Sequence, residues 1–464
     1  MISRTATIAL VAVGCHAADV APTAPVFASG GNVVDAQGRT IVLRGVNARA
    51  DSFFDDNEQL VPLPPFTVDD CQFVGEQLGG NQLRLPINWS YLEPTQGTLA
   101  DSYVAAVLAL AAGCVQYGVY TLVDLHQDGW SKYVGQDGAP FWAHQPALPA
   151  DDIDQHDGNQ ASTSQAVQTE MTGFFDDTAD LIPAYASMAS RLATQIDKQP
   201  GIIGLEIINE PIAAPTALDA FYSTVAAAVR AVAPGLPLYA EPSATRNIVD
   251  YAVPPIIPQD DIIYSPHLYT GVFQGDWMVG DNARIESSIQ NMQSEAAKMA
   301  APIVVTEFGN DPADPTGAAW LAAALDLLDQ YALSASLWVY EEWPSTCGQP
   351  SCWGLYDEAP VMDGSGATTS YTRTLRSAAV ALIARPYPQA IAGTLDSFAY
   401  DQPSKTLTVQ LHGTSGTHQL AAPMLVYPGD VVVTCDGQAV PATRTGGSVA
   451  VACAGSTLVM TAAD

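Results

Sequence analysis

The segment Tyr120-Thr-Leu-Val-Asp-Leu-His126 is a short apolar run that ends in a polar side chain. Runs of this length that are almost continuously hydrophobic predict strands buried on both faces of a parallel sheet. The same pattern occurs seven more times along the chain, and Ala-rich helical stretches separate the runs. The eight predicted strands are Ile41–Asn47, Gln82–Ile87, Tyr120–His126, Gly204–Glu210, Pro237–Ser243, Ile263–Tyr269, Ile303–Gly309 and Ala335–Glu341.

Strands that alternate with helices form parallel βα units, and eight such units close into a (β/α)8 TIM barrel. The predicted fold class is therefore α/β, and the length of the segment leaves room for inserted loops. The polar, acid-rich stretch from Ala147 to Asp180 is expected to be one long loop near the barrel mouth.

The pattern changes near Arg385-Pro-Tyr-Pro388, where short alternating stretches separated by Gly and Pro begin. Such stretches predict a small C-terminal antiparallel β-sandwich. We therefore divide the chain into a leader and linker at 1–28, a barrel domain at 29–384 and a β-sandwich at 385–464. The predicted sandwich strands include Thr406–Leu411, Met424–Tyr427, Val431–Cys435 and Ser448–Val451.

The N-terminus carries one early positive charge in Met1-Ile-Ser-Arg4, followed by an apolar run from Ala6 to Val13. This arrangement is typical of an export signal, and the run is too short to span a bilayer. Cys15 resembles the lipid-attachment site of bacterial lipoproteins, and the alternative is an ordinary signal peptide cut a few residues later. Both alternatives predict a protein that is secreted or anchored in the cell envelope.

The chain is strongly acidic, with 49 acidic and only 17 basic residues among 464 and a formal net charge of −32. Such a surface repels phosphate groups, which proteins bind through Lys and Arg. Nucleic acid and anionic membrane surfaces are therefore not expected as partners. We interpret the acidity itself as a property of solubility or of a salty habitat.

Seven cysteines are an odd number, and setting Cys15 aside leaves six. An exported protein can hold disulfide bonds. The sequence shows no CxxC pair and no His/Cys cluster at zinc-ligand spacing, so we predict neither a metal site nor a cofactor. Pairing of nearest neighbours predicts three bridges, Cys71–Cys114, Cys347–Cys352 and Cys435–Cys453.

Polar side chains gather at the ends of the predicted strands, where (β/α)8 enzymes carry their catalytic groups. Glu210 and Glu307 end strands four and seven, which face each other across an eight-stranded barrel. Glycoside hydrolysis requires two such carboxyl groups, one to protonate the leaving oxygen and one to attack the anomeric carbon. The other candidates for the site are Arg84, His126, Asp128, Asn209, His267, Tyr269 and Trp338.

Several of these residues lie in segments that resemble a known family. Ile207-Ile-Asn-Glu-Pro211 resembles the acid/base motif of glycoside hydrolase family five, and Val305-Thr-Glu-Phe-Gly309 resembles its nucleophile motif. Leu83-Arg-Leu85 and His267-Leu-Tyr269 are similar to the segments that carry the conserved arginine, histidine and tyrosine of that family.

The resemblance implies a retaining enzyme in which Glu210 is the general acid/base and Glu307 is the nucleophile. It also implies that Asn209 binds the sugar 2-hydroxyl group, and that Arg84 and Tyr269 keep Glu307 ionised. No metal and no cofactor are implied by this mechanism.

Three candidates have a structural interpretation beside the functional one. His126 could be a core histidine bonded to the backbone, and Asp128 could cap a turn. Trp338 could pack inside the barrel, although a platform for the sugar ring is the use that we expect at that strand end. Most other tryptophans are expected to pack, with one or two lining a groove for the aglycone; they are Trp89, Trp130, Trp142, Trp277, Trp343 and Trp353.

Within the family the chain is similar to the endoglycoceramidases. Asp124-Leu-His-Gln-Asp128 together with Asp137-Gly-Ala-Pro-Phe-Trp142 resembles their signature at strand three. Ser265-Pro-His-Leu-Tyr269 and Arg385-Pro-Tyr-Pro-Gln-Ala-Ile-Ala-Gly393 match as well. The resemblance implies endo-acting cleavage of the linkage between glycan and lipid in glycosphingolipids.

The chain departs from that subfamily in two places. Endoglycoceramidases carry a sugar-binding lysine shortly after strand one, but this chain has none between Gly45 and Phe54, and Arg49 is not a geometric equivalent. The stretch from Glu341 and Glu342 to the Cys347–Cys352 loop is also unlike the subfamily. Both departures concern the choice of glycan, because they leave the two glutamates in place.

Two alternative functions remain open at this point. One is a family-five β-glucanase or exo-β-glycosidase that acts on polysaccharide or another glycoside, and the other is a non-catalytic carbohydrate-binding barrel. The expected partner is a glycolipid or an oligo- or polysaccharide substrate. Peripheral membrane contact could come through a lipid substrate or a lipid anchor, and the chain is expected to be a monomer.

Overall fold

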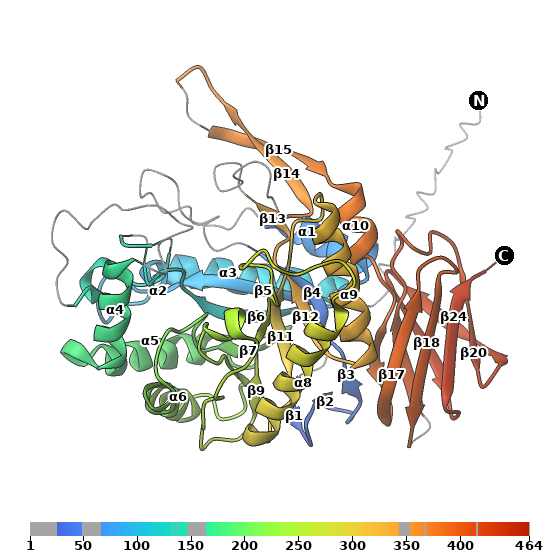
Figure 1. Ribbon diagram of the computed structural model, residues 1–464, viewed down its shortest axis with the longest axis horizontal. Helices are drawn as coiled ribbons and strands as arrows, with labels where there is room; N and C mark the ends of the chain where they lie inside the picture. The colour runs from blue at the N-terminus through green and yellow to red at the C-terminus, as the bar shows by residue number, and fades with distance from the viewer. Residues whose placement is uncertain are drawn as a thin grey trace, which may run out of the picture.

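A curled parallel sheet forms the centre of the molecule (Figure 1). The computed structural model describes residues 26–48, 66–131, 133–135, 137–145, 164–342, 353–365, 368–413 and 416–463. Neighbouring strands of the sheet are paired in parallel throughout. In chain order they are β4 (Arg44–Asn47), β5 (Gln82–Asn88), β6 (Tyr120–His126), β7 (Ile202–Glu206), β8 (Leu238–Ala240), β9 (Ile262–Tyr264), β10 (His267–Leu268), β11 (Val304–Phe308) and β12 (Ser334–Leu337).

The sheet closes because β9 and β10 are two segments of one strand. β9 pairs with β8, β10 pairs with β11, and a parallel bridge joins Tyr264 to Ile303 at the seam. Ser265 and Pro266 separate the two segments, and a proline has no N–H to contribute to a ladder. The strands therefore form a closed barrel, which confirms the predicted (β/α)8 architecture.

Helices cover the outside of the barrel, and their ends follow local sequence signals. For example, Asp314 caps α9 by accepting the backbone N–H groups of Thr316 and Gly317, and Pro315 occupies the first turn. The longer helices are α3 (Asp101–Cys114), α5 (Leu181–Ile196), α6 (Pro215–Arg230), α8 (Asn282–Met299) and α9 (Pro315–Gln330). The shorter ones are α1 (Val68–Gln72), η2 (Phe73–Leu78), α2 (Trp89–Leu92), η3 (Val115–Tyr117), η4 (Phe141–Ala143), α4 (Gln165–Phe175), η7 (Thr178–Asp180), α7 (Arg246–Val249) and α10 (Ser377–Ile383).

The prediction of one long loop from Ala147 to Asp180 is wrong in its second half. Residues 146–163 lie outside the described part, but α4 and η7 follow directly. Ser164 caps α4 by accepting the N–H of Val167, and one face of the helix is buried. The polar composition of this stretch concealed an amphipathic helix.

Two antiparallel sheets form the C-terminal module, which confirms the predicted β-sandwich. Met424–Tyr427, however, is not a strand: the N–H groups of Val426 and Tyr427 both donate to the carbonyl of Pro423, which makes a turn. One sheet contains β16 (Pro388–Ile391), β19 (Gly416–Ala421), β22 (Ala442–Thr445) and β23 (Ser448–Cys453). The other contains β17 (Thr394–Asp401), β18 (Thr406–His412), β20 (Val431–Cys435), β21 (Gln438–Val440) and β24 (Thr457–Ala462).

The first sheet of this module also contains the first described residues of the chain. β1 (Val26–Ser29), β2 (Asn32–Asp35) and β3 (Thr40–Ile41) form its edge, and β3 pairs with β16 through Ile41 and Ala390. The predicted strand Ile41–Asn47 is therefore divided, since only its second part belongs to the barrel. The domain boundaries given above stay a prediction.

A long hairpin projects from the barrel beside α1 and α10 (Figure 1). It consists of β14 (Tyr356–Met362) and β15 (Thr368–Leu375), and the short strand β13 (Glu341–Glu342) pairs with β14 in parallel. The buried carboxylate of Glu341 contacts the guanidinium of Arg373 in this hairpin. The stretch after Trp338 is thus built as a separate small sheet.

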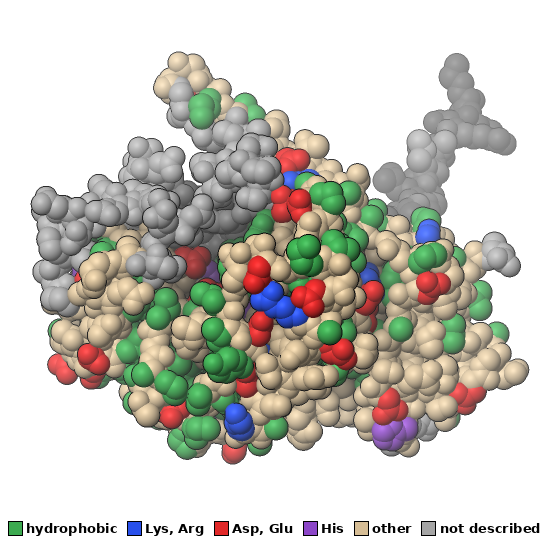
Figure 2. Space-filling view, viewed as in Figure 1, with side chains coloured by type: hydrophobic (Ala, Val, Ile, Leu, Met, Phe, Trp, Pro, Cys, Tyr) green, Lys and Arg blue, Asp and Glu red, His purple; other side chains and the backbone are tan. Residues whose placement is uncertain are grey.

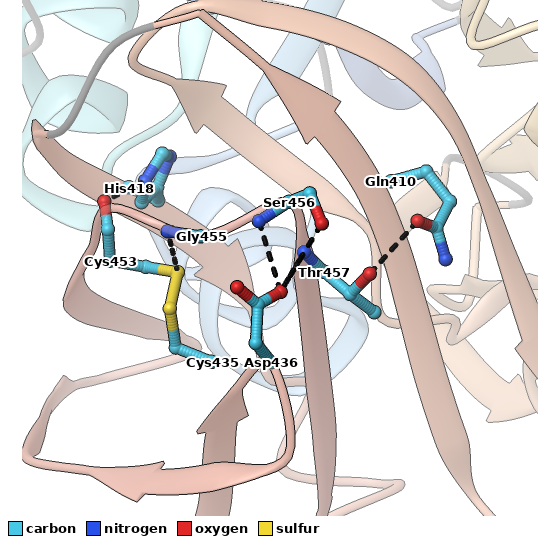
Figure 3. The surroundings of a disulfide bond; sticks show 8 residues. All are labelled: Gln410, His418, Cys435, Asp436, Cys453, Gly455, Ser456 and Thr457. Atoms are coloured by element: carbon cyan, nitrogen blue, oxygen red, sulfur yellow. Dashed lines mark hydrogen bonds between the residues drawn. A yellow bond between two sulfur atoms is a disulfide. The ribbon is translucent and has the colours of Figure 1, made fainter.

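Two of the three predicted disulfides are present. Cys71–Cys114 joins α1 to the end of α3, and Cys435–Cys453 joins β20 to β23 (Figure 3). Near the second bridge, Asp436 accepts the N–H groups of Ser456 and Thr457. The predicted pair Cys347–Cys352 lies outside the described residues, as do Cys15, Arg49 and residues 1–25 of the predicted leader and linker, whose last three residues belong to β1. In the described ranges no helix has both the length and the apolarity to cross a bilayer.

Candidate active site

Arg84, the third residue of β5, lies at the centre of the candidate site and is fully buried. Its Nε is 2.5 Å from Glu206 Oε2, and its Nη1 is 2.5 Å from Glu307 Oε1. Burial alone lowers the pKa of Arg84, but Asp124, Glu206 and the other carboxylates around it raise this pKa well above its usual value. The guanidinium is therefore a permanent positive charge. It also donates to Asn47 and Asn209.

Glu307 lies in β11 beside His267 of β10, because the parallel register pairs these two residues directly. Its Oε2 accepts a hydrogen bond from the Tyr269 hydroxyl at 2.8 Å, while Arg84 binds Oε1. Burial raises the pKa of Glu307, and the cations His267 and Arg84 oppose that rise without cancelling it. Both carboxylate oxygens are thus held in a fixed orientation.

Glu210 lies four residues beyond the end of β7, so the predicted strand Gly204–Glu210 is too long at this end. Its backbone is left-handed, with φ of 43°, and its N–H donates to Glu241 Oε2 at 2.9 Å. Non-glycine residues rarely adopt this conformation, which often marks a functional position. The carboxylate accepts a hydrogen bond from Asn247 at 2.6 Å and remains partly exposed.

One edge of the His267 ring faces both glutamates. Its Nδ1 lies 2.8 Å from Glu210 Oε1 and 3.4 Å from Glu307 Oε2. Burial alone lowers the pKa of His267, but Glu241 and Glu307 raise it well above the usual value. One carboxylate oxygen of Glu210 and one of Glu307 lie within 4.8 Å of each other. The structure therefore brings the two sequence-predicted carboxylates together.

Three buried acids of the site were missed by the sequence analysis: Asp124, Glu206 and Glu241. Oε1 of Glu241 lies 3.3 Å from Arg84 Nη2 and 3.4 Å from His267 Nε2. Burial raises the pKa of Glu241 to about 8, against the opposing effect of His267. A carboxylate inside an apolar strand is costly unless it is paired, and this signal was present in the sequence.

The predicted residues His126, Asp128 and Trp338 lie together on another side of the site. The His126 ring stacks on Trp338, with centroids 5.5 Å apart and planes 6° from parallel. Its Nδ1 is 2.6 Å from Asp124 Oδ2, and its Nε2 is 3.5 Å from Asp128 Oδ2. Burial alone lowers the pKa of His126, but Asp124 raises it well above the usual value. His126 is thus paired with a side chain and not with the backbone.

Asn209 connects this group to the Arg84 cluster. Its Oδ1 accepts a hydrogen bond from Arg84 Nη2 at 2.8 Å, and its Nδ2 donates to the carbonyl of Gln127 at 3.1 Å. Nδ2 also lies 3.4 Å from His126 Nε2. All nine predicted residues of the site therefore belong to one connected set of contacts.

An aromatic group leads from the nucleophile candidate towards the surface. The Tyr269 ring lies 4.8 Å from that of Phe273 and 5.9 Å from that of Trp353, measured between centroids. Trp89, in contrast, packs edge-on against both Trp130 and Trp142; Trp89, Trp130 and Trp277 are buried, and Trp142 is partly buried. Trp343 lies outside the described residues.

Two groups of described side chains have ligand atoms close enough together for a metal ion. They come from separate strands and loops, so no spacing in the sequence indicated them. The first group is His126 with Asp128 and Asp137, and the second is Glu210 with His267 and Glu307. In the second group Arg84, Tyr269 and Asn247 already bond to the carboxylates.

Most of the chain matches one known protein family. Residues 34–342 match the family model of cellulase (glycosyl hydrolase family 5). The chain belongs to glycoside hydrolase family 5. Residues 385–459 match a second model, the glycoside hydrolase family 5 C-terminal domain, which covers the β-sandwich. The chain is therefore an O-glycosyl hydrolase, and the retaining mechanism of this family applies to it.

Several known proteins are similar to the chain. It is 25% identical over 327 residues to endoglycoceramidase I of Rhodococcus hoagii (strain 103S), an alignment that spans 64% of each protein. It is 32% identical over 138 residues to ergosteryl-beta-glucosidase of Saccharomyces cerevisiae, which is 24% of this chain and 18% of that protein. The crystal structure of endogalactoceramidase has a TM-score of 0.75 and 25% identity, with 95% of this chain and all of that chain covered.

Proposed function

We propose that this family 5 enzyme is a retaining, endo-acting β-glycosidase that cleaves the linkage between glycan and lipid in glycosphingolipids. Glu210 acts as the general acid/base and Glu307 acts as the nucleophile. The observation that carries the proposal is the pair of carboxylates set within 4.8 Å of each other around His267. Retaining glycosidases hold their carboxyl groups about 5–5.5 Å apart, whereas inverting enzymes leave about 6.5–9.5 Å for a water molecule.

In the first step, the protonated carboxyl group of Glu210 gives its proton to the glycosidic oxygen. Glu307 attacks the anomeric carbon, the bond to the aglycone breaks, and a covalent glycosyl–Glu307 intermediate forms. Arg84 and Tyr269 direct Glu307 in this step, because each holds one of its oxygens. Positive charge at Arg84 and His267 also favours the ionised nucleophile.

In the second step, the ionised Glu210 removes a proton from water, and the water attacks the anomeric carbon of the intermediate. The glutamate ester breaks and Glu307 leaves as a carboxylate, so two inversions restore the original configuration. Asn247 and His267 hold Glu210 Oε1 in both steps. Both residues are thus proposed to position the group that carries the proton.

The remaining candidates are proposed to bind the sugar. Asn209 offers its amide to the 2-hydroxyl group, while its carbonyl oxygen is held by Arg84. His126 and Asp128 form a polar edge, and Trp338 offers a ring face for stacking on the sugar. The contact between His126 and Trp338 supports one shared subsite for these three residues.

The glycolipid substrate is supported by the names of the similar proteins, which include an endoglycoceramidase and an endogalactoceramidase. The match to ergosteryl-beta-glucosidase favours a second candidate, an exo-β-glucosidase acting on another lipid glycoside. A family 5 β-glucanase is the third candidate. Family membership and the connected set of contacts at Glu210 and Glu307 argue against the non-catalytic sugar-binding barrel considered from the sequence.

A panel of substrates tests the proposal: gangliosides, lactosylceramide, gala-series glycolipids, a steryl glucoside, aryl β-glycosides and β-glucans. We expect release of an intact oligosaccharide together with ceramide, and proton NMR should show the β-anomer as the first product. Release of glucose alone from the steryl glucoside would favour the second candidate. Hydrolysis of β-glucans alone would overturn the glycolipid substrate, and an α-anomer would overturn retention.

We also propose that the protein is exported, with or without a lipid at Cys15. The apolar run near the N-terminus and the disulfides Cys71–Cys114 and Cys435–Cys453 support this proposal, because such bonds persist in oxidising compartments. Expression in a bacterial host followed by mass spectrometry of the mature N-terminus tests it. A lipid mass that disappears in Cys15→Ala would show anchoring, and an uncleaved chain in the cytoplasm would contradict export.

A further inference from the structure

Arg246, the first residue of α7, has a guanidinium that is almost completely buried. Its Nε donates to Glu295 Oε2 at 2.9 Å. Its Nη1 donates to the backbone carbonyl of His267 at 3.1 Å, and its Nη2 donates to that of Ser288 at 3.0 Å. This single side chain therefore connects α7 to β10 and to two turns of α8.

Glu295 of α8 binds this guanidinium and also holds the segment after β8 at a second point. Its Oε1 accepts the backbone N–H of Ala252 at 2.7 Å, and its Oε2 also accepts the hydroxyl of Tyr264 at 2.6 Å. The glutamate is buried as well. Segment 246–252 is therefore tied to α8 at both of its ends, and Asn247 lies between these two ties.

The two residues that hold Glu210 Oε1 are both fixed by Arg246. Asn247, whose amide donates to that oxygen at 2.6 Å, is the next residue in the chain. His267, whose Nδ1 lies 2.8 Å from the same oxygen, has its backbone carbonyl bound by the guanidinium. One guanidinium therefore sets the positions of Asn247 and His267 relative to each other.

The burial of this ion pair points to a role in position more than in stability. Figure 2 shows basic side chains that lie beside acidic ones on the surface, where both partners keep most of their hydration. Arg246 and Glu295 lose that hydration, and hydrophobic residues of similar volume often stabilise a protein as well as a buried ion pair does. Hydrophobic side chains cannot, however, replace the directed hydrogen bonds to His267 and Ala252.

We propose that Arg246 and Glu295 are positioning residues for the general acid/base of the reaction. They hold Asn247 and His267 in place, and these two residues direct the carboxyl group of Glu210 towards the glycosidic oxygen. This inference rests on the proposed function, in which Glu210 gives its proton to that oxygen. Arg246 and Glu295 act through their neighbours and not by contact with the reacting atoms.

Two leaving groups test this inference, in phenyl and 2,4-dinitrophenyl glycosides that are each made as the β-lactoside and the β-galactoside. A 2,4-dinitrophenolate leaves without a proton from the acid, whereas a phenolate needs one. Arg246→Lys keeps the charge but cannot make three directed bonds from a planar group, so kcat/KM for the phenyl glycoside should fall about a hundredfold. The value for the 2,4-dinitrophenyl glycoside should stay close to that of wild type, because kcat/KM reports the first step alone.

A double variant keeps the test decisive if Arg246→Lys does not fold. Arg246→Met/Glu295→Leu leaves no buried charge and should melt close to wild type, but it lacks the bond to the carbonyl of His267 and should show the same selective loss. The matched control is Arg44→Lys. Arg44 begins β4, at the opposite end of the barrel strands from the site, and is buried in an ion pair with Asp329 at 2.8 Å. This control should change kcat/KM for both glycosides by the same factor.

Selectivity between the two leaving groups separates a role in position from a role in folding. Equal losses on both glycosides in Arg246→Lys and the double variant, or no loss in either variant, would overturn the inference. Glu210→Ala is the reference variant and should show the same selectivity with a larger loss. A Glu210→Ala variant that loses both activities equally would instead overturn the role proposed for Glu210, as would a wild type that hydrolyses none of these glycosides.

Discussion

The carboxylate of Glu307 accepts a charged hydrogen bond at one oxygen and a neutral one at the other, from Arg84 and Tyr269. The neighbouring imidazole of His267 connects it to Glu210. Ionisation and direction of the nucleophile thus depend on side chains from β5 and β10 and the residue after β10. Single substitutions at these positions should separate the roles proposed above.

Glu307→Gln keeps the shape of the side chain and removes the nucleophile. We expect kcat to fall on the order of a thousandfold or more, with an unchanged melting temperature. In Glu307→Gly, azide should restore turnover and give a glycosyl azide of inverted configuration. Azide acting on Glu210→Ala is the control and should give the retained configuration. A retained azide product from Glu307→Gly together with an inverted one from Glu210→Ala would reverse the assigned roles.

The pH dependence of kcat/KM should reflect the environment of Glu307. Burial raises the pKa of this group above its usual value of 4.5, and the nucleophile must be ionised. Activity should therefore fall as the pH drops through that raised pKa, at a higher pH than for an ordinary carboxyl group. His267→Asn removes a cation that lowers the pKa, so the acid limb should move to still higher pH. An acid limb of the wild-type kcat/KM profile with its midpoint at or below pH 4.5 would contradict this account.

Glu241 is expected to position both Glu210 and His267. It accepts the backbone N–H of Glu210, and in its ionised form it is the group that most raises the pKa of His267. Glu241→Ala should lower kcat on the order of a hundredfold by displacing Glu210. Glu241→Gln keeps an acceptor for that N–H and should lose less, while the pKa of His267 falls, which NMR titration can measure. Equal losses in both variants with an unchanged His267 pKa would indicate a role in stability alone.

The sequence predicted the two glutamates and most of their companions because they stand at or just beyond the end of an apolar run, whereas Arg84, the third residue of β5, was predicted through the family resemblance of Leu83-Arg-Leu85. Asp124, Glu206 and Glu241 were not predicted because they lie inside or beside such runs, where apolar core residues are the norm. Asn247 gave no signal, since its contact with Glu210 depends on the path of a loop. Strand ends are visible in a sequence, but side-chain partners across the barrel are not.

Among the elements, β6 has the bounds that were predicted, because both of its faces are buried and its hydrophobic run is unbroken. The strand at Ile263–Tyr269 is instead divided at Pro266, which has no N–H for the ladder. α4 was missed although Val167, Met171 and Phe174 are spaced at i, i+4 and i+7 and are all buried. The periodic signal was present, and the polar composition outweighed it.

The Cys71–Cys114 bridge ties α1 to α3 across a separation of 43 residues. In the chain-entropy model, a loop of this length corresponds to about 4 kcal/mol of stability. The double variant Cys71→Ser/Cys114→Ser should therefore lower the melting temperature by several degrees. Cys435→Ser/Cys453→Ser, with a separation of 18, is the matched comparison and should cost about 3 kcal/mol. A melting temperature that both variants leave unchanged would contradict this stabilising role.

Across the whole molecule, the barrel and the C-terminal module share a sheet and a charged contact. β3 pairs with β16, and Arg385 binds Asp329 of α9 at 2.9 Å. The N–H groups of Met424 and Leu425 donate to carbonyls in η2. The composition change near Arg385 was visible in the sequence. The return of β1–β3 to that module was not, because pairing between distant segments leaves no local pattern.

Deletion of residues 385–464 should destabilise the barrel, because it removes the partner of β3 and one of the two arginines at Asp329. We expect little soluble protein and a markedly lower melting temperature. Arg385→Lys is a milder control that keeps the module, weakens the contact with Asp329 and should remain folded. A truncated chain that melts like the full one and cleaves aryl glycosides normally would contradict this coupling.

The pairing of β3 with β16 also affects how the protein is made. Ile41 meets Ala390, a residue that the ribosome adds about 350 positions later. At about 5–20 residues per second, this interval is roughly 20–70 s. During that time the edge of β3 has unsatisfied backbone groups and is open to wrong partners. The native sheet forms only once synthesis is nearly complete. The nascent chain should therefore remain without this sheet, and able to be threaded through a narrow channel, until late in synthesis.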